Sequence, residues 1–110
     1  MTRSEAYRGL SEVVDLQLAE RRGSKVEILT VNPNPWLTTT VIEFYVPIEG
    51  EAHWEFYDVA GKTLLTRKEN YTKGRHQLIL NRSDLPSSGV IYAKLKTNIG
   101  VTEYKMLVIN

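Results

Sequence analysis

The chain contains no cysteine, which excludes disulfides, thiolate metal sites and a cysteine nucleophile. It has no apolar run that approaches the ~18 residues needed for a membrane-spanning helix. Its first residues also lack the apolar core of a signal peptide. If a protein with this sequence is exported, we expect its signal peptide to lie upstream of residue 1.

The sequence has almost no excess of charge of either sign, since the formal net charge is +1 at pH 7. Nucleic-acid-binding domains usually present a strongly basic face, so this balance argues against nucleic acid as a partner. The length of 110 residues suits one domain with a modest core.

Catalytic and metal-binding motifs are also missing, since there is no G-x-S-x-G, phosphate loop or H-E-x-x-H. His53 and His76 fall on different predicted strands, without an acidic or nucleophilic partner at a spacing that would make a site. Asp58 and Asp84 fall in turns, where an aspartate accepts hydrogen bonds from backbone N–H groups, and no cluster of oxygen ligands for Ca²⁺ surrounds them. We therefore expect a protein that is not an enzyme and needs no cofactor or metal.

Short segments of alternating apolar and polar residues, separated by glycine and proline, dominate the sequence. They predict strands over 12–18, 25–31, 38–46, 51–58, 62–68, 75–81, 90–97 and 100–109. Leu10 to Leu18 also fits helical spacing, but the β-branched pair Val13–Val14 favours a strand. Together these segments predict an all-β fold, an immunoglobulin-like antiparallel β-sandwich of about seven strands with an additional N-terminal strand or hairpin.

The pattern changes at Asn32. Residues 1–31 are polar and ambiguous in period, and we expect them to be the end of a preceding region or a linker. Within them, 12–18 and 25–31 could pair as a hairpin across Gly23. Residues 32–110 form the predicted sandwich.

The last segment, 100–110, ends in an apolar run from Met106 to Ile109, whereas most domains end in a polar, frayed tail. As a strand it would place two sets of side chains on opposite faces: Thr102, Tyr104, Met106 and Val108, and Glu103, Lys105, Leu107 and Ile109. One interpretation is a last core strand. The other is a terminal signal that another protein must recognise.

Six segments with turn or anchor residues follow one another in order: Asn32–Trp36, Thr39–Phe44, Phe56–Lys62, Lys73–His76, Asp84–Tyr92 and Lys105–Ile109. Pro33 and Pro35 restrict their neighbours to extended geometry, which predicts a rigid corner that includes Asn34 and the aromatic anchor Trp36. Asp58 and Gly61 predict a turn, and Gly89 predicts the release of the chain into the next strand. Each of these residues has a sufficient structural reason to be present.

In this order and spacing, residues 32–110 resemble the type A-like C-terminal sorting domain of cargo proteins of the type IX secretion system in Bacteroidota. The sequence departs from the family pattern at three positions. Trp36 stands where phenylalanine is usual, Tyr104 where a basic residue is common, and Asn110 where lysine or glutamate is frequent.

The resemblance implies a non-enzymatic secretion and sorting signal. Its cargo would pass through the periplasm, meet the translocon and an outer-membrane shuttle β-barrel, and reach the cell surface, commonly after cleavage and attachment by a sortase. The segment implied for recognition comprises Lys105, Met106, Leu107, Val108, Ile109 and Asn110. The candidate cleavage region, chosen for exposure and small residues, is Arg22, Gly23 and Ser24.

The alternative is a mature β-sandwich module for adhesion or carbohydrate binding on a surface protein. It predicts clustered aromatic residues on a ligand-binding face and tolerance of changes in the last residues. A spacer domain without a dedicated partner is the third interpretation. In each case an exposed apolar strand also predicts a weak homodimer through strand pairing.

Overall fold

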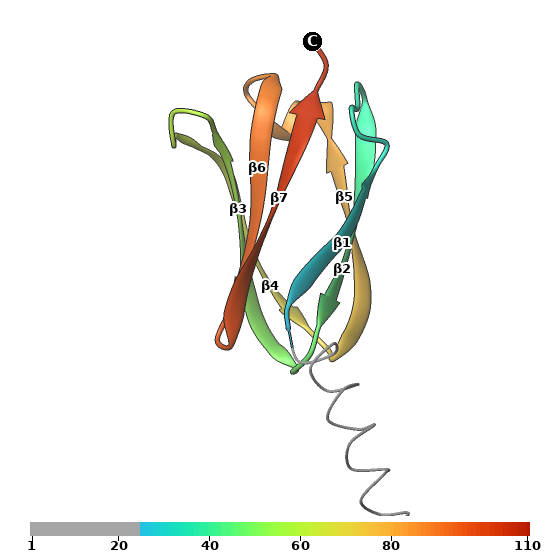
Figure 1. Cartoon of the computed structure of the whole chain (residues 1–110), viewed down its shortest axis with the longest axis vertical. Coiled ribbons are helices and arrows are strands. Elements are labelled where there is room, and N and C mark those ends of the chain that lie inside the picture. Colours follow the sequence, from blue (N-terminus) through green and yellow to red (C-terminus); the bar gives the residue numbers. More distant parts are fainter. Residues whose placement is uncertain (1–24) are drawn as a thin grey trace, which may run out of the picture.

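The computed structural model describes residues 25–110, which form a two-layered β structure (Figure 1). Its elements are β1 (Glu27–Asn32), β2 (Thr39–Val46), β3 (Gly50–Asp58), β4 (Thr63–Tyr71), β5 (Gly74–Asn81), the 3₁₀ turn η1 (Arg82–Asp84), β6 (Gly89–Thr97) and β7 (Gly100–Val108). Within this part no helix is long and apolar enough to cross a membrane. The predicted strand 12–18 and the candidate cleavage residues Arg22, Gly23 and Ser24 lie outside the described residues.

The strands form two antiparallel sheets, which confirms the predicted β-sandwich. Their orders are β1-β2-β5 and β4-β3-β6-β7, and the sheets face each other across the core. In the constant-type immunoglobulin arrangement the fourth strand joins the sheet of the first, second and fifth strands. Here β4 instead pairs with β3, which makes β4 an edge strand of the four-stranded sheet.

Strand β1 belongs to the sandwich. It pairs with β2, with Glu27 opposite Tyr45 and Asn32 opposite Val41. Val26, Ile28 and Val31 are each 6% exposed and lie in the core. Residues 27–31, which the sequence pattern assigned to a preceding region, are therefore part of the folded unit.

The core is formed by the inward sides of strands from both sheets. Aromatic rings fill its centre, where Phe44 meets Trp54 edge to face with ring centroids 5.0 Å apart and Trp54 stacks on Phe56 at 5.7 Å. Such pairs contribute about 0.5–1.5 kcal/mol beyond their burial. The Trp54 Nε1 group donates a hydrogen bond of 3.1 Å to the Tyr71 hydroxyl at the edge of the sheet. Trp54 therefore lies in the core, and its polar atom is satisfied.

The turn between β3 and β4 is organised by Asp58. Its Oδ1 atom accepts hydrogen bonds from the backbone N–H groups of Ala60 (3.0 Å) and Lys62 (2.9 Å). Gly61 has a φ of 85°, in the region that favours glycine. Asp58 and Gly61 thus position the hairpin and do not point to a ligand.

The loop after β5 is organised in a similar way by Asp84. Its Oδ2 atom accepts a hydrogen bond of 2.8 Å from the Asn81 N–H, and its Oδ1 atom lies 3.2 Å from Arg67 Nη2. Leu85 anchors the loop in the core at 4% exposure. Gly89, with a φ of 99°, then leads the chain into β6.

Candidate recognition site on the terminal strand

The six residues of the predicted recognition segment divide between the two faces of β7. Met106 and Val108 are each 1% exposed and belong to the core, whereas Leu107 is 41% and Ile109 45% exposed. Lys105 and Asn110 are also exposed. While the sandwich is folded, only Lys105, Leu107, Ile109 and Asn110 can present their side chains to a partner.

The outer edge of β7 is covered by the segment Asn34–Trp36, here called the clasp. The Leu107 N–H donates to Asn34 Oδ1 (2.9 Å), the Trp36 N–H donates to the Leu107 carbonyl (3.0 Å), and the Ile109 N–H donates to the Trp36 carbonyl (2.8 Å). Trp36 and Val108 form a parallel bridge. Since β6 pairs with the other edge of β7, the backbone around Leu107 is bonded on both sides.

The clasp is anchored at both ends. The buried Thr40 hydroxyl donates a hydrogen bond of 2.6 Å to the Pro33 carbonyl. Trp36 is 1% exposed, and its Nε1 group has no hydrogen-bond partner among residues 25–110. The peptide bonds before Pro33 and Pro35 are both cis. Besides its hydrogen bonds to β7, the clasp is therefore anchored by a polar contact at Pro33, directly before it, and by the buried side chain of Trp36.

An apolar patch surrounds the clasp. Leu37 and Ile109 directly follow Trp36 and Val108, the buried pair of the parallel bridge. Leu37 is 55% exposed. Together with Leu107 they form an exposed aliphatic surface, the kind of feature that marks an interaction site when its members are contiguous.

A second group of side chains meets on the outer face of the four-stranded sheet. Tyr57 lies opposite Tyr92 on neighbouring strands, Tyr92 lies opposite Lys105, and Val90 lies opposite Leu107. The two tyrosine rings stack with centroids 5.4 Å apart and an interplanar angle of 22°. The sequence pattern showed only that tyrosines occur on several strands. The pairing of β3 with β6, which are not consecutive, brings these two together.

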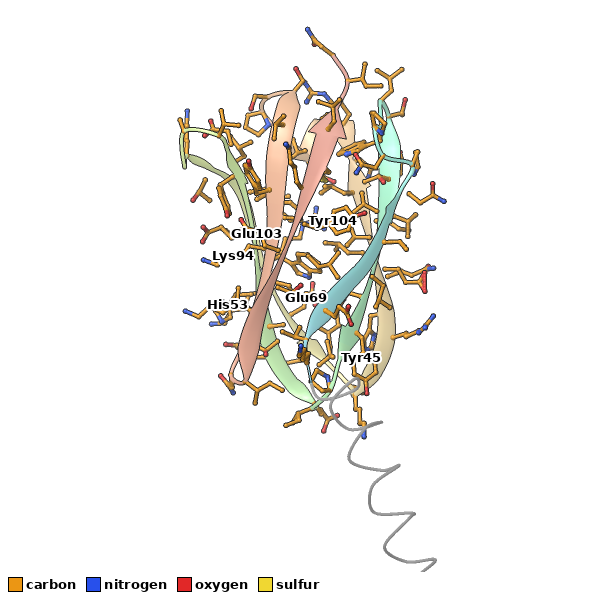
Figure 2. All side chains as sticks on the ribbon, viewed as in Figure 1. Tyr45, His53, Glu69, Lys94, Glu103 and Tyr104 are labelled. Atoms are coloured by element: carbon orange, nitrogen blue, oxygen red, sulfur yellow. The ribbon has the colours of Figure 1, made fainter. Side chains whose placement is uncertain are left out.

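The same face is charged further from the clasp, where a shallow hollow of about 600 Å³ lies over β3, β4 and β6. Its lining includes Glu51, His53, Lys68, Lys94 and Lys96. The side chains of His53, Lys94 and Glu103 point away from the core on this side (Figure 2). The hollow is thus a solvated part of the sheet surface.

Glu51 is the centre of a small exposed network in this hollow. Its Oε1 atom lies 3.0 Å from His53 Nε2 and 3.5 Å from Lys68 Nζ. The hydrogen bond from His53, with the positive charge of Lys68, lowers the pKa of Glu51. The side chains of His53 and Glu51 are each about half exposed, so the network contributes little to the stability of the fold.

The other histidine is far from this network in the fold. His76 Nε2 donates a hydrogen bond of 2.7 Å to the Thr72 carbonyl, and its ring lies 5.7 Å from that of Phe44. Residues 25–110 contain no group of three or more His, Cys, Asp or Glu side chains that could hold a metal ion. The structure therefore does not bring the two histidines together into a site.

Comparisons of the chain with protein-family models, with curated proteins and with solved structures found no match. The likeness to type IX sorting domains therefore rests on the ordered sequence segments alone.

Proposed function

We propose that the sandwich is a type IX C-terminal sorting domain, a folded, non-enzymatic signal that directs an upstream cargo protein across the outer membrane. Its recognised element is the end of β7, read by the translocon and then by the shuttle β-barrel. The observation that supports this proposal is the division of β7, which buries Met106 and Val108 and exposes Leu107 and Ile109.

This division makes recognition compatible with a folded domain. Full burial of an aliphatic side chain contributes about 1.5–3 kcal/mol. Leu107 and Ile109 are already more than half buried, so each would contribute roughly half of that on contact with a partner. Because the clasp occupies the N–H groups of residues 107 and 109 and the carbonyl group of residue 107, recognition there proceeds through side chains and not through strand addition.

The test is export of a fluorescent protein fused ahead of the full chain, in a host that has the type IX system. Deletion of the last five residues would remove Met106 and Val108 and unfold the core, so a sharper variant is L107S/I109S. The matched control is I79S, because Ile79 is 57% exposed on β5 of the other sheet. We expect L107S/I109S to lose export while it remains folded, and I79S to be exported normally.

Two results would contradict the proposal. Export of L107S/I109S at the normal level would show that the exposed end of β7 is not read. A wild-type fusion that stays in the periplasm would contradict the sorting function itself.

We further propose that export is followed by sortase cleavage near Arg22, Gly23 and Ser24, which precede the first sandwich strand, and by attachment of the cargo to the cell surface. Mass spectrometry of the surface cargo should then find peptides that end in this region. Cargo that retains residues 25–110 after export would exclude cleavage.

A further inference from the structure

We propose that the outer face of β3, β6 and β7 carries a docking surface for a partner protein, made by Tyr57, Tyr92, Lys105 and Leu107 and here called the tyrosine face. The partner that fits it presents an apolar groove bordered by a carboxylate. The inference rests on the proposed function, because Lys105 and Leu107 also belong to the recognition segment.

The four side chains form a continuous surface. Tyr57 and Tyr92 are cross-strand neighbours, and so are Tyr92 and Lys105. Leu107 follows Lys105 by two residues on the same face of β7. All four point away from the core, because their sequence neighbours Phe56, Ile91 and Met106 are buried. The surface runs from the centre of the sheet to the apolar patch at the clasp.

The arrangement of the rings favours a protein over a sugar. A sugar-binding platform offers the flat face of an aromatic ring to the apolar face of the sugar. Tyr57 and Tyr92 stack on each other at 5.4 Å, so part of one face of each ring lies against the other ring and is withdrawn from a ligand. Tyrosine is enriched where proteins meet proteins, because it combines a large apolar ring with a hydroxyl group.

The charge of Lys105 indicates what the partner must contain. Lys105 is exposed, and none of the ion pairs formed among residues 25–110 includes it. A partner that covers Tyr92 and Leu107 would remove water from the ammonium group between them. Burying a charge without a counter-charge is unfavourable, so a matching partner carries a carboxylate at this position.

The test uses the export assay with the full chain and two variants, Y57T/Y92T and K105E. Y45T and K96E are the matched controls. Tyr45 lies on β2, on the outer side of the other sheet (Figure 2), and Lys96 lies on β6 two residues beyond Lys94. We expect Y57T/Y92T and K105E each to reduce export at least ten-fold and the controls to export normally. Thermal unfolding of each purified variant accompanies the assay. K105E replaces an exposed side chain, so it tests the face even if Y57T/Y92T folds poorly.

The outcomes separate this inference from the proposed function. If L107S/I109S blocks export while both tyrosine-face variants are exported normally, the docking surface is wrong and the sorting function stands. If the wild-type fusion is not exported, both the sorting function and the docking surface are wrong. If Y57T/Y92T is exported normally but loses binding to an oligosaccharide array that the wild type retains, the face belongs to a carbohydrate-binding module.

Discussion

The two lateral sides of the sandwich are closed in different ways. On one side, β7 is covered by the clasp through three hydrogen bonds, and Thr102 Oγ1 accepts a further one of 3.3 Å from the Ile28 N–H of β1. On the other side, β4 and β5 end their sheets without a further strand. There Arg67 and Glu69 lie opposite the buried residues Trp54 and Ala52, so they share the inner face with them.

The difference shows two ways in which a small domain can protect strand edges. Inward-pointing charges discourage strand addition at the β4 edge. The clasp blocks strand addition at the end of β7 and leaves its side chains accessible. The predicted weak homodimer through strand pairing would therefore have to use β1, β4 or β5, or displace the clasp.

The largest expected effect comes from the core face of β7. Met106→Ala should destabilise the fold by about 2–5 kcal/mol, because it leaves a cavity in the closed side. Leu65→Ala on β4 should cost less, since Leu65 is only partly buried. Urea unfolding of both variants measures the difference, and equal losses would show that the two sides are packed alike.

The two tryptophans give the next comparison. Trp54 is bonded to Tyr71 of the edge strand β4, and Trp36 belongs to the clasp that covers β7. Trp54→Phe leaves the Tyr71 hydroxyl without its donor, whereas Trp36→Phe removes an N–H group that has no partner in the described residues. Trp54→Phe should therefore be more destabilising than Trp36→Phe by about 0.5–1.5 kcal/mol. Denaturant midpoints that rank the two variants in the opposite order would contradict this account of the indole groups.

A smaller effect should follow from removing one polar contact on each side. Asn34→Ala takes away the acceptor of the Leu107 N–H and should cost about 0.5–1.5 kcal/mol. Arg67→Ala breaks the partly exposed ion pair with Asp84 and should cost about 0–1 kcal/mol. Hydrogen exchange of the Leu107 amide should accelerate in Asn34→Ala and not in Arg67→Ala. If the Leu107 amide stays protected in Asn34→Ala, the clasp does not hold β7.

The smallest expected effect is on the stability of the fold at alkaline pH, and it comes from Tyr71 on β4. Burial raises the pKa of Tyr71 above its ordinary value of 10.0. The folded state therefore holds this proton more tightly, so its stabilising contribution is present below about pH 10 and is lost as pH rises through the raised pKa. Unfolding measured from pH 9 to 11.5 should show a shallower loss in Tyr71→Phe, after correction for its lower stability at neutral pH. If stability falls with pH at the same slope in both proteins, Tyr71 is not the source of the loss.

Local pattern by itself determined where the strands of the described part lie, the turn at Asp58 and Gly61, and which side chains of β7 share a face. It ended the fourth strand at residue 68, whereas β4 continues to Tyr71. These features depend on residues a few positions apart, since a strand alternates with a period of two and a turn spans four residues. The bond from Leu107 to Asn34 joins residues 73 positions apart, and the stack of Tyr57 on Tyr92 requires β3 to pair with β6. Only the tertiary structure decided these contacts, the place of β1 in the sandwich and the pairing of β4 with β3. Which strands pair with each other depends on how all the strands together bury their apolar faces. The alternation of residues within one strand carries no information about this.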